Sequence, residues 1–398
     1  MENFSWSRLP DHILIQFFSY IPLVERWKVA LVCKSWQTCF DHPRLWRYFK
    51  FRFMEPKDKV KLRCLDKYKN VLKSVVIELQ QKEKENRDCA CEVITRLARC
   101  KERKLQNITL NFVGQNPMFF RGGEFINALA ELFGPPDPSC SMVFTLKEVD
   151  LSGMSVVYSD ILFNLLADNH PNLEVLNILN TSLNCNTCTV KPYCILSVVK
   201  KCTKLRELGL FYCSISEEVL LELAEEGRAS LQKLSVMCRR EEKYGVDIPD
   251  SAWETLTKQN PNLKVYIAFD HTCPLHKIQA ILQPHIPIKV LRLDTFTVLH
   301  NEVFQAAAYY SSTLEEVVVQ GKPSADLNRA LINLAVSSPN LRSLHCYCVL
   351  DKDTVDSILN GCPRLETYTL KTHVENHPWM PILVGRQVTT NLNNMWLK

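Results

Sequence analysis

The sequence predicts an α/β fold, in which a small N-terminal helical domain precedes a solenoid of repeated strand–helix units. A six-residue pattern, Leu-x-x-φ-x-φ with φ apolar, recurs along most of the 398 residues. Apolar residues at helical spacing lie between the copies, which is typical of a helix that follows each strand. The first fifty or so residues have short helical stretches and no copy of the pattern.

The first helix is predicted to begin near Pro10-Asp11 and to end before Pro22. Proline is tolerated in the first helical turn, and an acidic residue there favours the positive end of the helix dipole. Shorter apolar stretches follow before and after His42-Pro43. A unit this small cannot bury all its aromatic side chains by itself. Its apolar surface is therefore expected to meet either a partner or the next domain, and periodicity alone leaves both open.

The order and types of these residues resemble the F-box motif, from Leu9-Pro10 through Leu31-Val32-Cys33 to Leu45-Trp46. The resemblance implies docking on the Skp adaptor, which links an F-box protein to a cullin scaffold. By position, the interface and its supporting core would comprise Leu9, Pro10, Ile13, Leu14, Leu31, Val32, Cys33, Trp36, Pro43, Leu45 and Trp46. Trp27 stands where the family usually has an aliphatic residue, so the local packing there is expected to differ from the family pattern.

The repeated pattern occurs in eleven copies, and the last four intervals between copies are 24 to 27 residues. That interval is typical of leucine-rich repeats, in which each unit is a short strand followed by a helix. The copies begin at Leu72, Leu105, Leu146, Leu173, Leu205, Leu231, Leu263, Ile288, Leu314, Leu341 and Leu365. We expect a horseshoe with strands on its concave side and helices on its convex side. The predicted division is an F-box at 4–53, repeats at 54–384 and a tail at 385–398.

The second, fourth and sixth residues after each leading Leu are expected to face the concave side, because side chains alternate along a strand. Candidate substrate contacts on that side are Phe211, Met237, Phe269, Arg292, His345 and Tyr347. Around Leu263 the register is open. A slip of one residue would bury Val265, Ile267 and Phe269 instead of exposing them.

Composition favours an intracellular globular protein. Hydrophobic residues make up 46% of the chain, and its start has no signal peptide. No stretch is long and apolar enough to cross a membrane. The 17 cysteines form no disulfide framework, so we expect the cytoplasm, the nucleus or both. Residues 1–63 carry 12 Lys and Arg against 6 Asp and Glu, but without aromatic residues placed for base stacking. Binding of nucleic acid or membrane is therefore not expected.

Motifs that carry catalysis are not found: the sequence has no Gly-rich phosphate loop, HExxH or GxSxG. Cys185 and Cys188, with Cys194 and Cys202, invite a zinc hypothesis, but the second pair has the wrong spacing. We expect no metal, no cofactor and no enzymatic activity.

F-box and repeats together resemble the F-box/LRR-repeat class of ubiquitin-ligase receptors. The resemblance implies a non-catalytic substrate-recognition subunit of a Skp–cullin–F-box (SCF) complex, which presents target proteins for ubiquitination and proteasomal degradation. An alternative is a non-degradative interaction scaffold that binds the adaptor.

Overall fold

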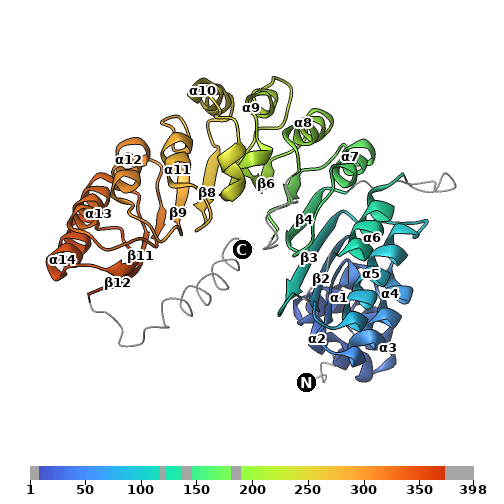
Figure 1. Ribbon diagram of the computed structural model, residues 1–398. Helices are drawn as coiled ribbons and strands as arrows, with labels where there is room; N and C mark the ends of the chain where they lie inside the picture. The colour runs from blue at the N-terminus through green and yellow to red at the C-terminus, as the bar shows by residue number, and fades with distance from the viewer. Residues whose placement is uncertain (1–8, 117–121, 136–145, 181–189, 373–398) are drawn as a thin grey trace, which may run out of the picture. The chain divides into compact units, whose positions relative to one another are not determined.

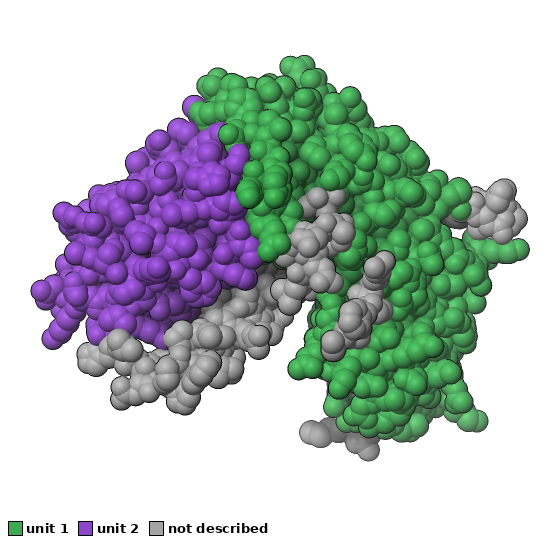
Figure 2. Space-filling model, in the orientation of Figure 1, with its two compact units in different colours: residues 1–266 green, residues 267–398 purple. Residues whose placement is uncertain are grey.

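The computed structural model describes residues 9–116, 122–135, 146–180 and 190–372. The chain divides into two compact units, residues 1–266 and 267–398, and each is described by itself (Figure 2). In each unit the helices lie on one face of a parallel sheet (Figure 1). The opposite face is called the open face below. The strand–helix repetition confirms the predicted α/β repeat fold.

Unit 1 begins with short helices. They are α1 (Asp11–Tyr20), α2 (Leu23–Arg26), η2 (Trp27–Leu31), α3 (Lys34–Phe40) and η3 (Pro43–Trp46). Pro10 is the N-cap of α1 and Asp11 lies in its first turn, as the sequence predicts. The α1 residues Leu14, Ile15 and Phe18 are buried, because they lie on one side of the helix.

The unit 1 strands pair in parallel in chain order from β1 to β7. They are β1 (Tyr48–Phe53), β2 (Ser74–Gln80), β3 (Asn107–Val113), β4 (Glu148–Gly153), β5 (Val175–Asn177), β6 (Glu207–Phe211) and β7 (Lys233–Cys238). The α-helices of the repeats are α4 (Leu62–Tyr68), α5 (Lys84–Ala98), α6 (Gly123–Phe133), α7 (Asp160–Asn169), α8 (Pro192–Lys201), α9 (Glu217–Leu223) and α10 (Asp250–Gln259). Three 3-10 helices also occur in unit 1: η4 (Pro56–Lys61), η5 (Tyr212–Ser214) and η6 (Arg240–Tyr244).

Strand β1 lies inside the range 4–53 that the sequence assigns to the helical domain. It pairs residue by residue with β2, from Tyr48 opposite Ser74 to Phe53 opposite Leu79. Its alternate residues Phe49, Phe51 and Phe53 are buried. The repeat sheet therefore begins before residue 54.

Strand β8 (Lys264–Phe269) spans the division between the two units, and its register settles the question left open by the sequence. Val265, Ile267 and Phe269 are buried, whereas Tyr266 is partly exposed. The slipped register is correct, and Phe269 is a core residue, not a surface contact. Burying the more apolar of the two strand faces is favoured by the hydrophobic effect.

Unit 2 contains β9 (Ile288–Leu293), β10 (Glu316–Val319), β11 (Ser343–Val349) and β12 (Thr367–Lys371). These strands also pair in parallel in chain order. The helices are α11 (Leu275–Ile281), α12 (His300–Tyr310), α13 (Ala325–Ser337) and α14 (Lys352–Gly361). The leading Leu314 and Leu341 are fully buried, and several helices end where Pro-Asn-Leu or Pro-Arg-Leu precedes the next strand.

Candidate functional site

The N-terminal helices expose a group of large apolar side chains. Tyr20 is 77% exposed, Leu31 73%, Val32 59%, Trp27 54% and Phe17 51%. Folded proteins seldom leave so many large apolar side chains in contact with water in so short a segment unless a partner covers them. These five residues are called the apolar helix surface below.

A buried arginine supports this surface. Arg26 Nη1 donates to the carbonyl oxygen of Leu45 at 2.5 Å, and Nη2 donates to those of Ile21 at 3.0 Å and Ser19 at 3.4 Å. Arg26 therefore joins the end of α1 to η3, and burial lowers the pKa of its guanidinium. The ring of Phe18 packs edge-on against Trp36, with centroids 5.1 Å apart.

Trp46 connects the helices to the first repeat. Its Nε1 donates to the carbonyl oxygen of Phe40 at 2.8 Å, and its ring stacks on Tyr68 of α4 at 4.0 Å. The Tyr68 hydroxyl donates to Asp41 at 2.8 Å, and Lys67 Nζ donates to the same carboxylate at 2.6 Å. Burial and the Asp41 hydrogen bond raise the pKa of Tyr68 to about 12. Within unit 1 the helices are thus packed tightly against the repeats.

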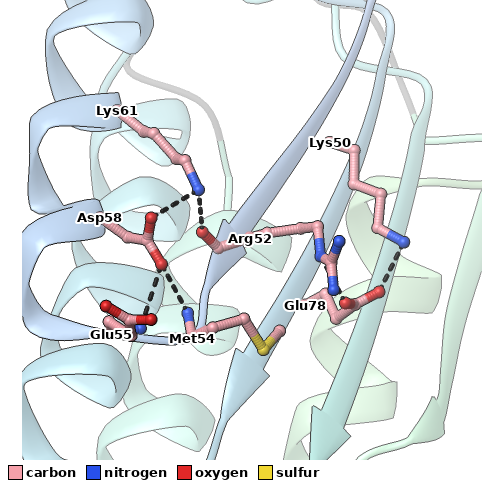
Figure 3. A network of polar contacts seen from close by, with 7 residues as sticks. All are labelled: Lys50, Arg52, Met54, Glu55, Asp58, Lys61 and Glu78. Carbon is pink, nitrogen blue, oxygen red and sulfur yellow. Dashed lines mark hydrogen bonds and ion pairs between the residues drawn. The ribbon is translucent and has the colours of Figure 1, made fainter. Parts of the chain in front are cut away.

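Figure 3 shows a polar network at β1 and η4, directly after this junction. Asp58 accepts hydrogen bonds from the backbone N–H of Met54 at 2.8 Å and of Glu55 at 3.1 Å, and from Lys61 Nζ at 2.8 Å. Burial opposes ionisation of Asp58, but these donors lower its pKa to about 2. Lys61 also donates to the carbonyl oxygen of Arg52 at 2.6 Å, which ties η4 to β1.

The second half of the network joins β1 to β2. Glu78 accepts from Lys50 Nζ at 2.5 Å and from Arg52 Nε at 2.7 Å. Burial raises the pKa of Glu78, but the two cations outweigh it and leave the pKa below its ordinary value. The network holds β1 in register with β2 from the open face.

The predicted adaptor-binding residues divide into surface and core. Pro10, Leu31, Val32 and Pro43 are exposed, and Leu9, Ile13, Cys33 and Trp36 are partly exposed. Leu14, Leu45 and Trp46 are buried and belong to the supporting core. The sequence prediction omitted Phe17, Tyr20 and Trp27. The departure of Trp27 from the family pattern could have pointed to it, because an aromatic residue outside the core often marks a contact.

Of the two residues predicted on the substrate face of unit 1, Phe211 is buried and Met237 is partly exposed. Phe211 is only 6% exposed, because the guanidinium of Arg239 lies 4.5 Å above its ring. The expectation that Phe211 is exposed is wrong. Arg239 follows β7 and reaches back over the neighbouring strand, which strand alternation cannot reveal. Met237 is partly exposed on β7.

In unit 2, the expectation that Arg292 is exposed is also wrong. It is 4% exposed and pairs with Asp294, with Nη2 and Oδ2 3.2 Å apart. His345 and Tyr347 are partly exposed neighbours on β11, and their rings are stacked with centroids 6.4 Å apart. The His345 ring nitrogens lie 2.9 Å from the hydroxyls of Ser343 and Thr369. Burial, with the nearby charge of Arg292, lowers the pKa of His345. Strand alternation also places Asp294 and Glu316 on this side, but they were not among the candidate substrate contacts.

No cluster of three or more His, Cys, Asp or Glu suited to a metal occurs among the described residues. Cys185 and Cys188 of the zinc hypothesis lie outside them. Burial raises the pKa of Cys91 and of Cys194 to about 12, so neither thiol is a ready nucleophile. No described helix has the length and apolar character that a membrane crossing requires.

Residues 6–52 match the F-box-like family. F-box/LRR-repeat protein 8 of Homo sapiens is 30% identical over 385 residues, which cover 95% of this chain and 98% of that protein. The Mus musculus protein of that name is 30% identical over 383 residues, with 95% and 98% covered. F-box/LRR-repeat protein 21 of Mus musculus is 25% identical over 408 residues, with 98% of this chain and 89% of that protein covered. With this similarity along nearly its whole length, the chain belongs to the F-box/LRR-repeat protein family.

Proposed function

We propose that the chain is the substrate-recognition subunit of an SCF-type ubiquitin ligase. The N-terminal helices bind the Skp adaptor, and the repeats bind a target protein for ubiquitination and proteasomal degradation. The observation that carries the proposal is the apolar helix surface, presented by an F-box-like segment that packs firmly on a repeat sheet. A protein of this kind needs both a docking surface and a separate recognition surface.

The division of labour follows the two kinds of structure in the chain. Residues 4–53 contain the docking helices and residues 54–384 supply most of the repeats, whereas the predicted tail at 385–398 lies outside the described residues. Strand β1 is the exception, because it lies in the first range and pairs with the sheet. The open faces of the sheets in the two units are the proposed target surface.

Adaptor contact is assigned to the eight exposed or partly exposed residues of the predicted set, together with Phe17, Tyr20 and Trp27, while Leu14, Leu45 and Trp46 form the core beneath them. Among these, Leu31 and Val32 are the most useful for a test, because they are exposed and their replacement disturbs no core. Pro10 is also exposed, but it is the N-cap of α1, so its replacement would also affect the helix start.

The proposed subunit makes and breaks no bonds itself and needs no cofactor. It holds a target lysine near a conjugating enzyme that carries ubiquitin, and so converts an encounter in solution into a tethered one. Tethering raises the effective concentration of the reacting groups without any new catalytic residue. We place this activity in the cytoplasm, the nucleus or both.

The test is co-purification of the full chain with the Skp adaptor and the cullin. A Leu31→Glu/Val32→Glu variant should lose adaptor binding by about tenfold or more, because it puts two charges into a desolvated contact. A Val246→Glu variant is the matched control, since Val246 is an apolar residue of unit 1 that is 87% exposed and lies outside the helices. A Leu9→Ala/Pro10→Ala variant tests the opening of the motif.

If the unaltered chain brings down neither adaptor nor cullin, the proposal is wrong. Binding of the adaptor without the cullin would favour the alternative of a non-degradative scaffold. Equal loss in the Leu31/Val32 and Val246 variants would mean that the apolar helix surface is not the docking surface.

A further inference from the structure

We infer that the open face of unit 2 binds a lysine or arginine side chain of the target, through Asp294 and Glu316 on either side of buried Arg292. The inference rests on the proposed function in one respect, namely that the repeats bind a protein. The occupant is a basic residue in an extended segment of that protein, with an apolar residue close by.

The first step is the incomplete pairing of Arg292. Only one of its nitrogen atoms, Nη2, has a bond to the Asp294 carboxylate, at 3.2 Å. Over the described part of the chain, Arg292 Nε and Asp294 Oδ1 are buried without a hydrogen-bond partner. Unpaired atoms of a buried ion pair cost stability, and the single bond from Nη2 means that Arg292 pairs with the Asp294 carboxylate only in part.

The second step is the free carboxylate of Glu316. In the register of the sheet Glu316 lies opposite Val290 on one side and Ser343 on the other. Arg292 lies opposite Val318, two residues further along the same strand as Glu316. Among the residues that the structure describes, none makes a hydrogen bond or an ion pair with the Glu316 side-chain carboxylate. Two carboxylates thus surround one guanidinium, and the local charge is negative.

The electrostatics of both acids point the same way. Burial raises the pKa of Asp294 and of Glu316, and the charge of Arg292 lowers each only in part. A further cation would stabilise both carboxylates, because the interaction of opposite charges is strengthened where water is excluded.

The neighbouring His345 does not provide that cation. His345, across from Val318 in the next strand, has both ring nitrogens next to hydroxyl groups, and burial lowers its pKa. It is therefore neutral at physiological pH. The stacked rings of His345 and Tyr347 instead offer a flat wall for the aliphatic stem of lysine or the plane of arginine.

An exposed aromatic residue lies two positions after Asp294. Phe296 is 50% exposed and has a φ of 58°, a left-handed conformation that is unfavourable for a bulky residue. Its backbone N–H donates to the carbonyl oxygen of Gln320 at 2.7 Å, which holds the turn. Strain of this kind is concentrated at ligand-binding sites. Phe296 is the proposed contact for the apolar neighbour of the basic residue.

The test uses the full chain and three pools of short fluorescent peptides that are identical except for the central residue. That residue is lysine, acetyl-lysine or glutamate, flanked by mixed apolar residues. Fluorescence anisotropy should show that the lysine pool binds most tightly. Glu316→Gln should reduce the preference for lysine over acetyl-lysine by about tenfold, because it removes one charged contact.

Glu366→Gln is the matched control. It makes the same substitution in unit 2, but the Glu366 side chain is 65% exposed and pairs with Arg342 at 3.7 Å. The preference of the Glu366→Gln variant for lysine over acetyl-lysine should equal that of the unaltered chain. Glu316→Lys should turn the preference towards the glutamate pool, which loss of folding cannot produce. Thermal melting of each variant confirms that it is folded.

The inference is overturned if the lysine pool does not bind, if it binds no better than the acetyl-lysine pool, or if Glu316→Gln behaves like Glu366→Gln. Adaptor co-purification is measured on the same preparations. Adaptor binding without lysine preference refutes this inference alone, whereas lysine preference without adaptor binding refutes the proposed ligase role alone.

Discussion

Replacing Arg26 with methionine should loosen the N-terminal helices while leaving their exposed surface chemically intact. Arg26 provides two short hydrogen bonds, 2.5 Å to Leu45 O and 3.0 Å to Ile21 O, and a longer one to Ser19 O. Hydrogen bonds to a charged group contribute about 1.5–3 kcal/mol each. Burial of the guanidinium offsets part of this, so we expect a net loss of about 3 kcal/mol in the free energy of local opening.

Hydrogen–deuterium exchange measures that opening directly. A loss of about 3 kcal/mol corresponds to an increase of about a hundredfold in the exchange of the most protected amides of α1 and α3. Lys28→Met is the control, because it removes the same charge two residues away. Lys28 forms an exposed ion pair with Glu25 at 2.8 Å, which contributes less than about 1 kcal/mol.

The reasoning about Arg26 is refuted if the two variants exchange alike. That result would mean that the backbone acceptors of Arg26 find other donors, or that α1 is held by its apolar contacts alone. If exchange rises as expected, adaptor binding should fall in the same variant, although no residue of the apolar helix surface has changed.

Two further predictions concern the start of the repeats and the core. Asp58→Asn should destabilise unit 1 by about 1 kcal/mol, because Asp58 is the N3 residue of the η4 capping box and accepts from the backbone N–H of the N-cap residue Glu55. The folded pKa of Asp58, about 2, lies below its unfolded value, so this contribution is present above about pH 4 and is lost as the pH falls towards 2. Urea unfolding of the variant and the unaltered chain from pH 7 to pH 2 should show their difference in free energy of unfolding disappearing. Phe269→Ala should cost about 3–5 kcal/mol in urea unfolding, and Met237→Ala less than about 1 kcal/mol. A small effect at Phe269 would contradict the register of β8.

The positions of the repeats could be predicted because the leading residue is buried in ten of the eleven copies; Leu365, in the last copy, is partly exposed. All eleven predicted copies coincide with strands, from β2 to β12. Strand β1 was not predicted, since Tyr48–Phe53 has no leading leucine and follows directly on the F-box pattern. Alternation alone misjudged Phe211 and left Phe269 undecided. The burial of Phe211 depends on Arg239, which reaches over from the next repeat. The burial of Phe269 depends on which face of β8 is more apolar.

The candidate sites were less predictable than the fold. Leu31 and Val32 were found through the family resemblance, but their exposure could not be read from two apolar residue types. Strand alternation placed Arg292, Asp294 and Glu316 on the same side, but it could not show that Arg292 is buried between the two acids. Only the folded sheet brings both acids to one arginine.

The pairing of β1 with β2 has a consequence for how the chain can be divided or recombined. A fragment that begins at residue 54 would leave the backbone groups of β2 unpaired along a flat edge, and such edges promote aggregation. A fragment that ends at residue 53 would lose Tyr68, on which Trp46 stacks. The F-box of this chain is therefore not an interchangeable module. Exchanging it for that of a relative should succeed only if the first repeat is carried with it.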